Sequence, residues 1–416
     1  MKKKIIFFIR HFNDLDHISP IIWSLLKTKK IEAIIFFTDP FNEKFFKKNF
    51  RTIILKKYGA KLVGFSDSNY RFKFLLPYIG SLFRLDNNFL NINIISSKIG
   101  GIILYLFFKK KFQDEFIKKK SFELINDNYS ILVFDHMVND LRKEIIKYSK
   151  NKKCINIALP HGAVLYSYKK KWLNKFKKKS ALSLKIFDKV IFPNGIDKFY
   201  GIEKKILKEK FLKLGSPRFT IPWINVLKNN FSKKMQKERK KINILFLVEK
   251  EFNFYQNRKH IISDIKKQTQ ILQFLKKQKN FSLKIKLNTR SITQSQLYRL
   301  EKFYNENISK DETNNLIFWS DIVICGGGTS IILQSIATKV PTICCTFLHP
   351  EHKFFYKNFG YPKEVKNFQE FAKFILGKNF LKVKSERKRL NFLKKIVMIN
   401  QNPFKLYNNF FLNLKK

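Results

Sequence analysis

The chain has 416 residues, of which 44% are hydrophobic, and this is enough for two packed globular domains. Its 84 Lys and Arg against 31 Asp and Glu give a formal net charge of +53, which favours contact with an anionic membrane surface. The lysines are spread along the chain and no common nucleic-acid-binding module is present, so we expect no specific nucleic acid as a partner.

Short apolar runs alternate with helical stretches along the whole chain, which is typical of parallel sheets built from βα units. We expect an α/β protein with two Rossmann-like, doubly wound domains that face a cleft. The expected strands are residues 5–9, 33–37, 61–65, 131–134, 155–158 and 189–192 in the first half, and 242–248, 283–287, 321–325 and 341–345 in the second. The expected divisions are an acceptor domain at 1–215, a linker at 216–240, a nucleotide-donor domain at 241–385 and a packing helix at 386–416.

The start of the chain predicts a first strand rather than a signal peptide, because only five apolar residues precede Arg10. The apolar segment 92–108 contains polar residues and falls short of the about 20 residues that a spanning helix needs. It is either a buried helix or one that lies against a membrane. None of the four cysteines shows CxxC spacing, so we expect buried thiols and a cytoplasmic protein. From the net charge we expect this protein to be peripheral at the inner face of the plasma membrane.

The first strand is followed by a loop that contains Asp14, Asp16 and His17. A carboxylate and an imidazole in one short loop are the minimum for deprotonating a hydroxyl, so Asp16 and His17 are candidate bases. The alternative is structural: Asp14 or Asp16 caps a helix that begins at Ile18, with Pro20 in its first turn.

Two further histidines follow predicted strands of the first half. Pro160 and Gly162 enclose His161 in a tight turn, which would point this histidine towards ligand and makes it a third catalytic candidate. Asp135 and His136 carry a weaker signal of the same kind. For each histidine the alternative is a purely structural role.

The second half contains a candidate phosphate cradle. A buried strand leads into Gly326, Gly327 and Gly328, which let the backbone approach a ligand closely, and Thr329 and Ser330 stand where a helix begins. The N–H groups of a helix start favour a diphosphate. The alternative is a helix cap that binds nothing.

Two basic side chains of the second half are candidates for neutralising the charge of a phosphate. Lys286 lies near the end of the expected strand at 283–287 and Arg290 follows this strand. Both are suited to a phosphate, Arg290 through a bidentate contact. No HExxH pattern is present and the seven histidines are scattered along the chain, so we expect no metal ion. The G-x-S-x-G turn of serine hydrolases is also absent.

With the cradle, the Pro160-His-Gly162 turn, Gly215-Ser-Pro-Arg218 and Asp16-His-Ile-Ser-Pro20, the chain resembles bacterial surface-carbohydrate biosynthesis proteins of the glycosyltransferase-B (GT-B) fold. The nearest families are the CDP-glycerol glycerophosphotransferase-like and Kdo-transferase-like proteins, and UDP-N-acetylglucosamine 2-epimerase is similar. The resemblance implies that residues 327–330 hold the donor diphosphate, and that the domain containing Asp16, His17 and His161 holds the acceptor.

Two positions depart from the pattern of these families. Gln334 stands where relatives often carry a Glu that holds the ribose or sugar of the donor, and Gln hydrogen-bonds a hydroxyl without bringing a charge. Asn288 stands where relatives have a histidine two residues before an arginine, which is Arg290 here.

The function we expect is transfer of a sugar from a nucleotide-diphosphate donor to a glycan or lipid-linked acceptor, in surface polysaccharide or lipid-linked glycan synthesis, with no cofactor. Three alternatives stay open: a transferase that uses a CDP-polyol donor, a nucleotide-sugar epimerase, and a relative that binds a nucleotide or glycan without turnover.

Overall fold

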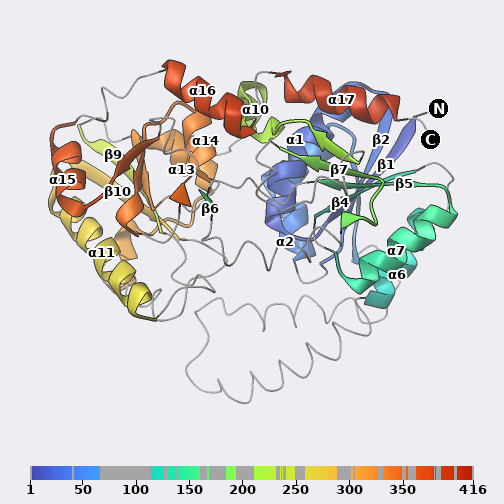
Figure 1. Ribbon diagram of the computed structural model, residues 1–416, viewed down its shortest axis with the longest axis horizontal. Coiled ribbons are helices and arrows are strands. Elements are labelled where there is room, and N and C mark those ends of the chain that lie inside the picture. Colours follow the sequence, from blue (N-terminus) through green and yellow to red (C-terminus); the bar gives the residue numbers. More distant parts are fainter. Residues whose placement is uncertain are drawn as a thin grey trace, which may run out of the picture. The chain divides into compact units, whose positions relative to one another are not determined.

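The computed structural model describes residues 2–39, 42–65, 114–125, 130–136, 138–159, 166–167, 184–193, 210–230, 235, 237, 240–248, 258–287, 301–302, 305–326, 331–348, 353–354, 362–378, 380, 386–397 and 401–414. The chain forms two compact units (Figure 1). Unit 1 comprises residues 1–162, 176–218 and 401–416, and unit 2 comprises residues 163–175 and 219–400.

Unit 1 is built on a seven-stranded parallel sheet with the strand order β3-β2-β1-β4-β5-β7-β8. Its strands are β1 (Lys3–Ile9), β2 (Ile31–Phe37), β3 (Lys61–Val63), β4 (Ile131–Asp135), β5 (Ile155–Leu159), β7 (Lys189–Phe192) and β8 (Phe211–Lys213). Its helices are α1 (Phe12–Lys27), α2 (Glu43–Lys48), α3 (Phe50–Lys57), α6 (Asp114–Leu124), α7 (Asp140–Asn151) and α17 (Pro403–Asn413).

Helices cover both faces of this sheet, because successive side chains of a strand point to opposite faces and both sets are apolar. Phe8 of β1 stacks on Phe134 of β4 and belongs to the core that α6 and α7 complete. Phe7, the preceding residue, contacts Phe411 of α17. Figure 1 shows α17 and the pair α6 and α7 on opposite sides of the strands.

Unit 2 contains a five-stranded parallel sheet with the order β10-β9-β11-β12-β14. These strands are β9 (Ile242–Leu247), β10 (Phe281–Lys286), β11 (Ile322–Cys325), β12 (Thr342–Cys345) and β14 (Lys363–Val365). The short strands β6 (Tyr166–Ser167) and β13 (Lys353–Phe354) form a separate antiparallel pair. The helices are α10 (Ile221–Asn230), α11 (Arg258–Lys277), α13 (Thr313–Trp319), α14 (Ile331–Ala337), α15 (Phe368–Leu376) and α16 (Glu386–Val397).

The expected fold class and all ten expected strands are confirmed, with strand ends within two residues of the prediction. Strands β8 and β14 have only three residues each and carry no apolar run that would have predicted them. The apolar segment 92–108 lies outside the described residues. In the described part of the chain no helix has the length and hydrophobicity to cross a membrane.

The domain divisions differ from the expected ones. Between residues 218 and 219 the chain passes from unit 1 to unit 2, and part of the expected linker at 216–240 instead forms α10, which buries Trp223 completely. Residues 386–416 form two helices instead of one: α16 belongs to unit 2 and α17 to unit 1. Trp23 of α1 packs edge-on against Phe404 of α17.

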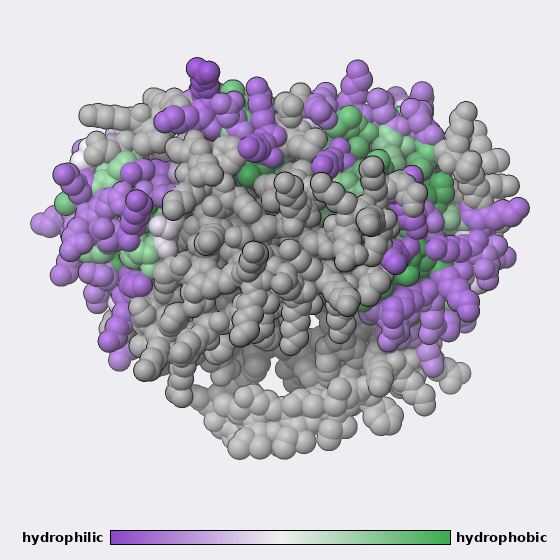
Figure 2. All heavy atoms as spheres, viewed as in Figure 1, coloured by the Kyte–Doolittle hydropathy of each residue, from purple (hydrophilic) through white to green (hydrophobic). Residues whose placement is uncertain are grey.

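All four cysteines are buried and unbridged, and Cys325 and Cys344, on neighbouring strands, have their Sγ atoms 3.9 Å apart. Figure 2 shows that hydrophilic side chains dominate the described part of the visible surface, with hydrophobic side chains between them.

Candidate functional site

Unit 1 has a topological switch point between β1 and β4. From β1 the chain adds β2 and β3 on one side, whereas β4, β5, β7 and β8 extend the sheet on the other side. Ligands of doubly wound sheets bind beyond the carboxyl ends of the strands at such a point. The residues that lie there are Arg10, which follows β1, and Asp135, which ends β4.

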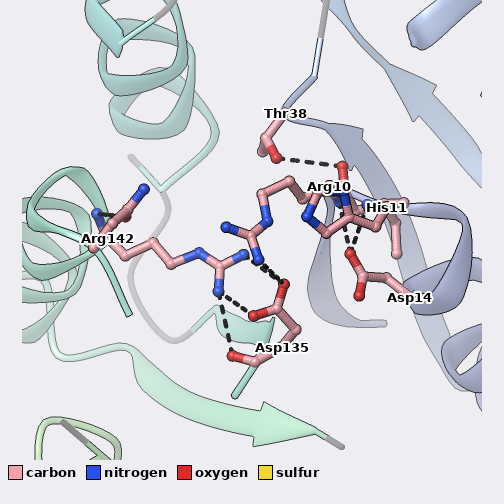
Figure 3. Close-up of polar contacts among 8 residues, drawn as sticks. Arg10, His11, Asp14, Thr38, Asp135 and Arg142 are labelled. Atoms are coloured by element: carbon pink, nitrogen blue, oxygen red, sulfur yellow. Dashed lines mark hydrogen bonds and ion pairs between the residues drawn. The ribbon is translucent and has the colours of Figure 1, made fainter. Parts of the chain in front are cut away.

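Asp135 joins two arginines at this edge of the sheet (Figure 3). Its carboxylate accepts two hydrogen bonds from Arg142 of α7, from Nη1 to Oδ1 at 2.5 Å and from Nη2 to Oδ2 at 2.9 Å. Nη2 of Arg10 lies 3.5 Å from the same Oδ2. Asp135 is only 1% exposed, so the arginines supply the charge compensation that its burial requires.

Asp14 fixes the turn between β1 and α1. Its Oδ2 accepts hydrogen bonds from the backbone N–H of Arg10 at 3.0 Å and of His11 at 2.7 Å (Figure 3). Helix α1 therefore begins at Phe12, six residues before the expected start at Ile18. Pro20 stands inside the helix rather than in its first turn. It lacks the N–H that would bond the carbonyl of Asp16.

Asp16 and His17 lie on the first turns of α1, and two arginines hold them. The Asp16 carboxylate pairs with Arg51 of α3 at 2.6 Å and with Arg218 at 3.3 Å. Nη1 of Arg218 also lies 2.9 Å from Nε2 of His17, within a buried contact. Gly215, with a φ of 74°, makes the turn after β8 that leads the chain to Arg218.

The chemistry of these groups determines which one donates. Because a guanidinium has only donors, Arg218 donates to His17, and Nε2 of His17 is the acceptor. The imidazole then carries its proton on Nδ1. Removal of a proton from a hydroxyl by Nε2 of His17 requires Arg218 to release its hydrogen bond, because that nitrogen has one lone pair. The Asp16 carboxylate keeps acceptor sites beside its contacts with Arg51 and Arg218.

The other candidate histidines of unit 1 have different positions. The ring of His136 donates from Nε2 to the carbonyl oxygen of Ile191 at 2.9 Å and packs against Phe192. This contact ties the end of β4 to β7 and gives His136 a structural role. His161 lies outside the described residues.

Unit 2 has its switch point between β9 and β11, since β10 extends the sheet from β9 and β12 and β14 extend it from β11. Strand β11 ends at Cys325, and Gly326 follows it as a buried residue. The expected cradle therefore begins at the carboxyl edge where this topology binds ligands. Gly327, Gly328, Thr329 and Ser330 lie outside the described residues.

Gln334 of α14 is 1% exposed, and neither its amide oxygen nor its amide nitrogen has a hydrogen-bond partner among the described residues. An unsatisfied buried amide costs on the order of 1–3 kcal/mol. Near the carboxyl end of α14, Arg389 of α16 donates to the carbonyl oxygen of Ile336 at 3.0 Å.

Lys286 ends β10, and its ammonium donates to the carbonyl oxygen of Asp311 at 2.6 Å. Burial lowers the pKa of Lys286 from its usual value, although the charges of Glu312 and Asp311 act in the opposite direction. The side chain that was expected to bind phosphate is therefore engaged with the segment that precedes α13. Arg290 lies outside the described residues.

No group of three or more His, Cys, Asp or Glu side chains suited to a metal ion occurs within the described ranges. Reasoning from sequence did not find Arg10, Arg51, Arg142 or the contact of Arg218 with His17. Arg218 could have been singled out from the sequence, because it belongs to the Gly215-Ser-Pro-Arg218 motif that the chain shares with GT-B-fold proteins.

Comparison with solved structures identifies the fold of the two sheets and their helices. A UDP-N-acetylglucosamine 2-epimerase matches with a TM-score of 0.53 and 10% identity, over 99% of this chain and 96% of that chain. The chain has the GT-B fold. The S. aureus MnaA protein, in a structure with UDP, matches with a TM-score of 0.52 and 13% identity, over 99% of this chain and 95% of that chain.

A third structure with this fold is the wall teichoic acid polymerase TagF, in a variant soaked with CDPG, with a TM-score of 0.52 and 12% identity. The match covers 97% of this chain and 86% of that chain. No protein-family model and no curated protein sequence matches the chain. At these identities the comparisons establish the fold.

Proposed function

We propose that the chain is a transferase that moves a sugar from a nucleotide-diphosphate donor to an acceptor hydroxyl, in the synthesis of a surface polysaccharide or a lipid-linked glycan. Unit 2 binds the donor and unit 1 binds the acceptor. The fold supports this reading, because similar structures include one with UDP and one soaked with CDPG.

The observation that carries the donor site is the unsatisfied amide of Gln334. Folding buries this side chain without a described partner, on the helix that follows β11 in the chain. Two neighbouring hydroxyls of the donor's ribose or sugar would satisfy both amide atoms, one by donating to the oxygen and the other by accepting from the nitrogen. The N–H groups that follow Gly326, the hydroxyls of Thr329 and Ser330, and Arg290 would hold the diphosphate.

In the transfer step the acceptor oxygen forms a bond to the anomeric carbon of the sugar, and the bond from that carbon to the nucleotide diphosphate breaks. The acceptor proton passes to His17, after Arg218 exchanges its bond to Nε2 for one to a substrate group, or to the Asp16 carboxylate. His161 is the third residue assigned to this step. The diphosphate leaves with the electron pair, and the cradle stabilises its charge.

Two other reactions could use the same donor and acceptor sites. With a CDP-polyol donor, the acceptor oxygen would attack phosphorus and form a phosphodiester, as the similarity to TagF with CDPG suggests. With a nucleotide sugar and no acceptor, the product would be an isomerised sugar. A relative without turnover would bind the nucleotide alone.

Product analysis distinguishes these functions. The purified protein is incubated with UDP-, GDP-, CDP- and CMP-activated sugars and with CDP-glycerol, with lipid-linked and soluble glycan acceptors. A new glycosidic bond together with free nucleotide supports the proposal. A phosphodiester product would instead identify a transferase that uses a CDP-polyol donor, and an isomerised sugar would identify an epimerase. Binding without any product would assign the chain to the non-catalytic class.

We also propose that the protein works in the cytoplasm at an anionic membrane surface, which its net charge of +53 would attract. A lipid-linked acceptor would be presented at such a surface.

A further inference from the structure

Helices α2 and α3 of unit 1 expose an unusual set of side chains. From residue 42 to residue 58, every exposed residue is either a lysine or a large hydrophobic residue. These residues, the α2–α3 face, are Lys44, Phe45, Lys48, Ile53, Lys56, Lys57 and Tyr58.

The spacing places these side chains on one side of each helix. In α3, Ile53, Lys56 and Lys57 stand at positions i, i+3 and i+4, which share one helical face. In α2, Lys44 and Lys48 stand at i and i+4, with Phe45 beside Lys44. The opposite sides of both helices are buried against the rest of unit 1.

The hydrophobic members of the face are well exposed: Phe45 is 43% exposed, and Ile53 and Tyr58 are 45% exposed. Exposed hydrophobic side chains that gather on one surface mark an interaction site. The other strongly exposed hydrophobic residues of the described chain include Ile221 and Leu376, which lie in unit 2 without such a cluster.

Among the described residues, no ion pair joins an acidic side chain to the lysines of this face. The segment 42–61 contains a single acidic residue, Glu43, which is buried and pairs with Lys47 at 2.8 Å. Helices α6 and α7, by contrast, carry exposed acids that pair with their lysines, such as Glu144 with Lys118 and Asp140 with Lys143.

We infer that the α2–α3 face is the surface by which this protein docks on an anionic lipid bilayer. The lysines would approach the phosphate head groups, and Phe45, Ile53 and Tyr58 would enter the boundary between head groups and acyl chains. The proposal deepens the proposed membrane contact by naming its residues. It does not depend on the transfer reaction, because vesicle binding is measured without turnover.

Cosedimentation with vesicles tests the proposal. The wild-type chain is titrated with vesicles of phosphatidylglycerol and phosphatidylcholine, and with phosphatidylcholine alone, at two salt concentrations. Four substitutions, K44Q, K48Q, K56Q and K57Q, lower the net charge from +53 to +49. Each lysine near an anionic surface contributes roughly fivefold to binding, so the four together should weaken it by 10-fold or more.

The matched control has the same net charge. It carries K266Q, K277Q, K279Q and K394Q, four exposed lysines of unit 2, and should bind the anionic vesicles within about threefold of wild type. A second variant, F45S with I53S and Y58S, should also lose binding, whereas I221S with L376S should keep it. Equal losses in the test and control variants, or wild-type binding by both test variants, would overturn the proposal.

Discussion

Asp321 accepts hydrogen bonds from both nitrogen atoms of Asn243, from the backbone N–H at 3.0 Å and from the side-chain amide at 2.9 Å. Asp188 and Asn156 form the same pair in the other sheet, at 2.7 Å and 3.3 Å. In each unit the Asp precedes a strand, and the Asn is the second residue of the neighbouring strand. The two sheets thus share one device that fixes the register of adjacent parallel strands.

The first prediction concerns the pH dependence of this pair. Burial raises the pKa of the Asp321 carboxyl, but hydrogen bonds from Lys237 and Asn243 outweigh it, and the pKa is lowered overall. A lowered pKa in the folded state stabilises the protein above the unfolded pKa, and this contribution is lost as pH falls through the folded value. D321N should therefore lower the free energy of unfolding by about 1 kcal/mol at neutral pH, after allowance for solvent screening.

Urea denaturation at several pH values measures this effect. The difference between wild type and D321N should shrink as the solution is acidified. Asp140 provides the control: its hydrogen bond with Lys143 also lowers its pKa, but its side chain is almost fully exposed, so D140N should leave unfolding unchanged. A D321N effect that grew on acidification would contradict the prediction.

The second prediction concerns the buried pair of Asp135 and Arg142. R142M removes the two hydrogen bonds that Arg142 makes to a buried carboxylate, and should cost about 3–5 kcal/mol. The double variant D135L with R142M removes both charges and should be more stable than R142M alone. Equal or greater loss in the double variant would show that the pair does not act as a unit.

The third prediction concerns the candidate base. If the proposed transfer occurs, replacing the residue that removes the acceptor proton should reduce turnover by about 100-fold or more. The variants that test the three candidates are H17A, D16A and H161A. H136A is the control and should keep turnover, because the ring of His136 is engaged in a structural hydrogen bond to the carbonyl oxygen of Ile191. Unchanged turnover in all three variants would remove these residues from the mechanism.

The fourth prediction concerns helix α17, whose Phe411 is completely buried and contacts Phe7 of β1. F411A should destabilise the protein by about 3–5 kcal/mol, because the cavity would lie between α17 and the sheet of unit 1. N409A changes an exposed position of the same helix and should stay within about 0.5 kcal/mol of wild type. Similar unfolding midpoints for the two variants would contradict the packing of α17.

The sequence predicted the sheets well because buried parallel strands appear as continuous apolar runs, such as Ile5–Ile9 within β1. It misplaced the start of α1, since Pro20 resembled a first-turn residue. The capping by Asp14 that begins the helix earlier depends on backbone N–H groups that a sequence does not show.

The charged networks of unit 1 could not be predicted from the sequence. Arg218 and His17 are 201 positions apart, and in a chain with 84 basic residues no single arginine stands out. Gln334, in contrast, could be singled out from the sequence. The sequence identified its position, but only the structure shows that both atoms of its amide are buried without a described partner.

The most direct test of the donor site is a thermal-shift series on wild type and Q334M with UDP, GDP, CMP, CDP and their sugar or glycerol conjugates. One nucleotide class at about 100 times its Kd should stabilise wild type by roughly 2.7 kcal/mol. Without ligand, Q334M should unfold at a higher temperature, because an unsatisfied buried amide has been replaced by an apolar group, and its response to the sugar conjugate should be weaker. A Q334M variant that is less stable without ligand, yet responds to every nucleotide as wild type does, would contradict a donor site at Gln334.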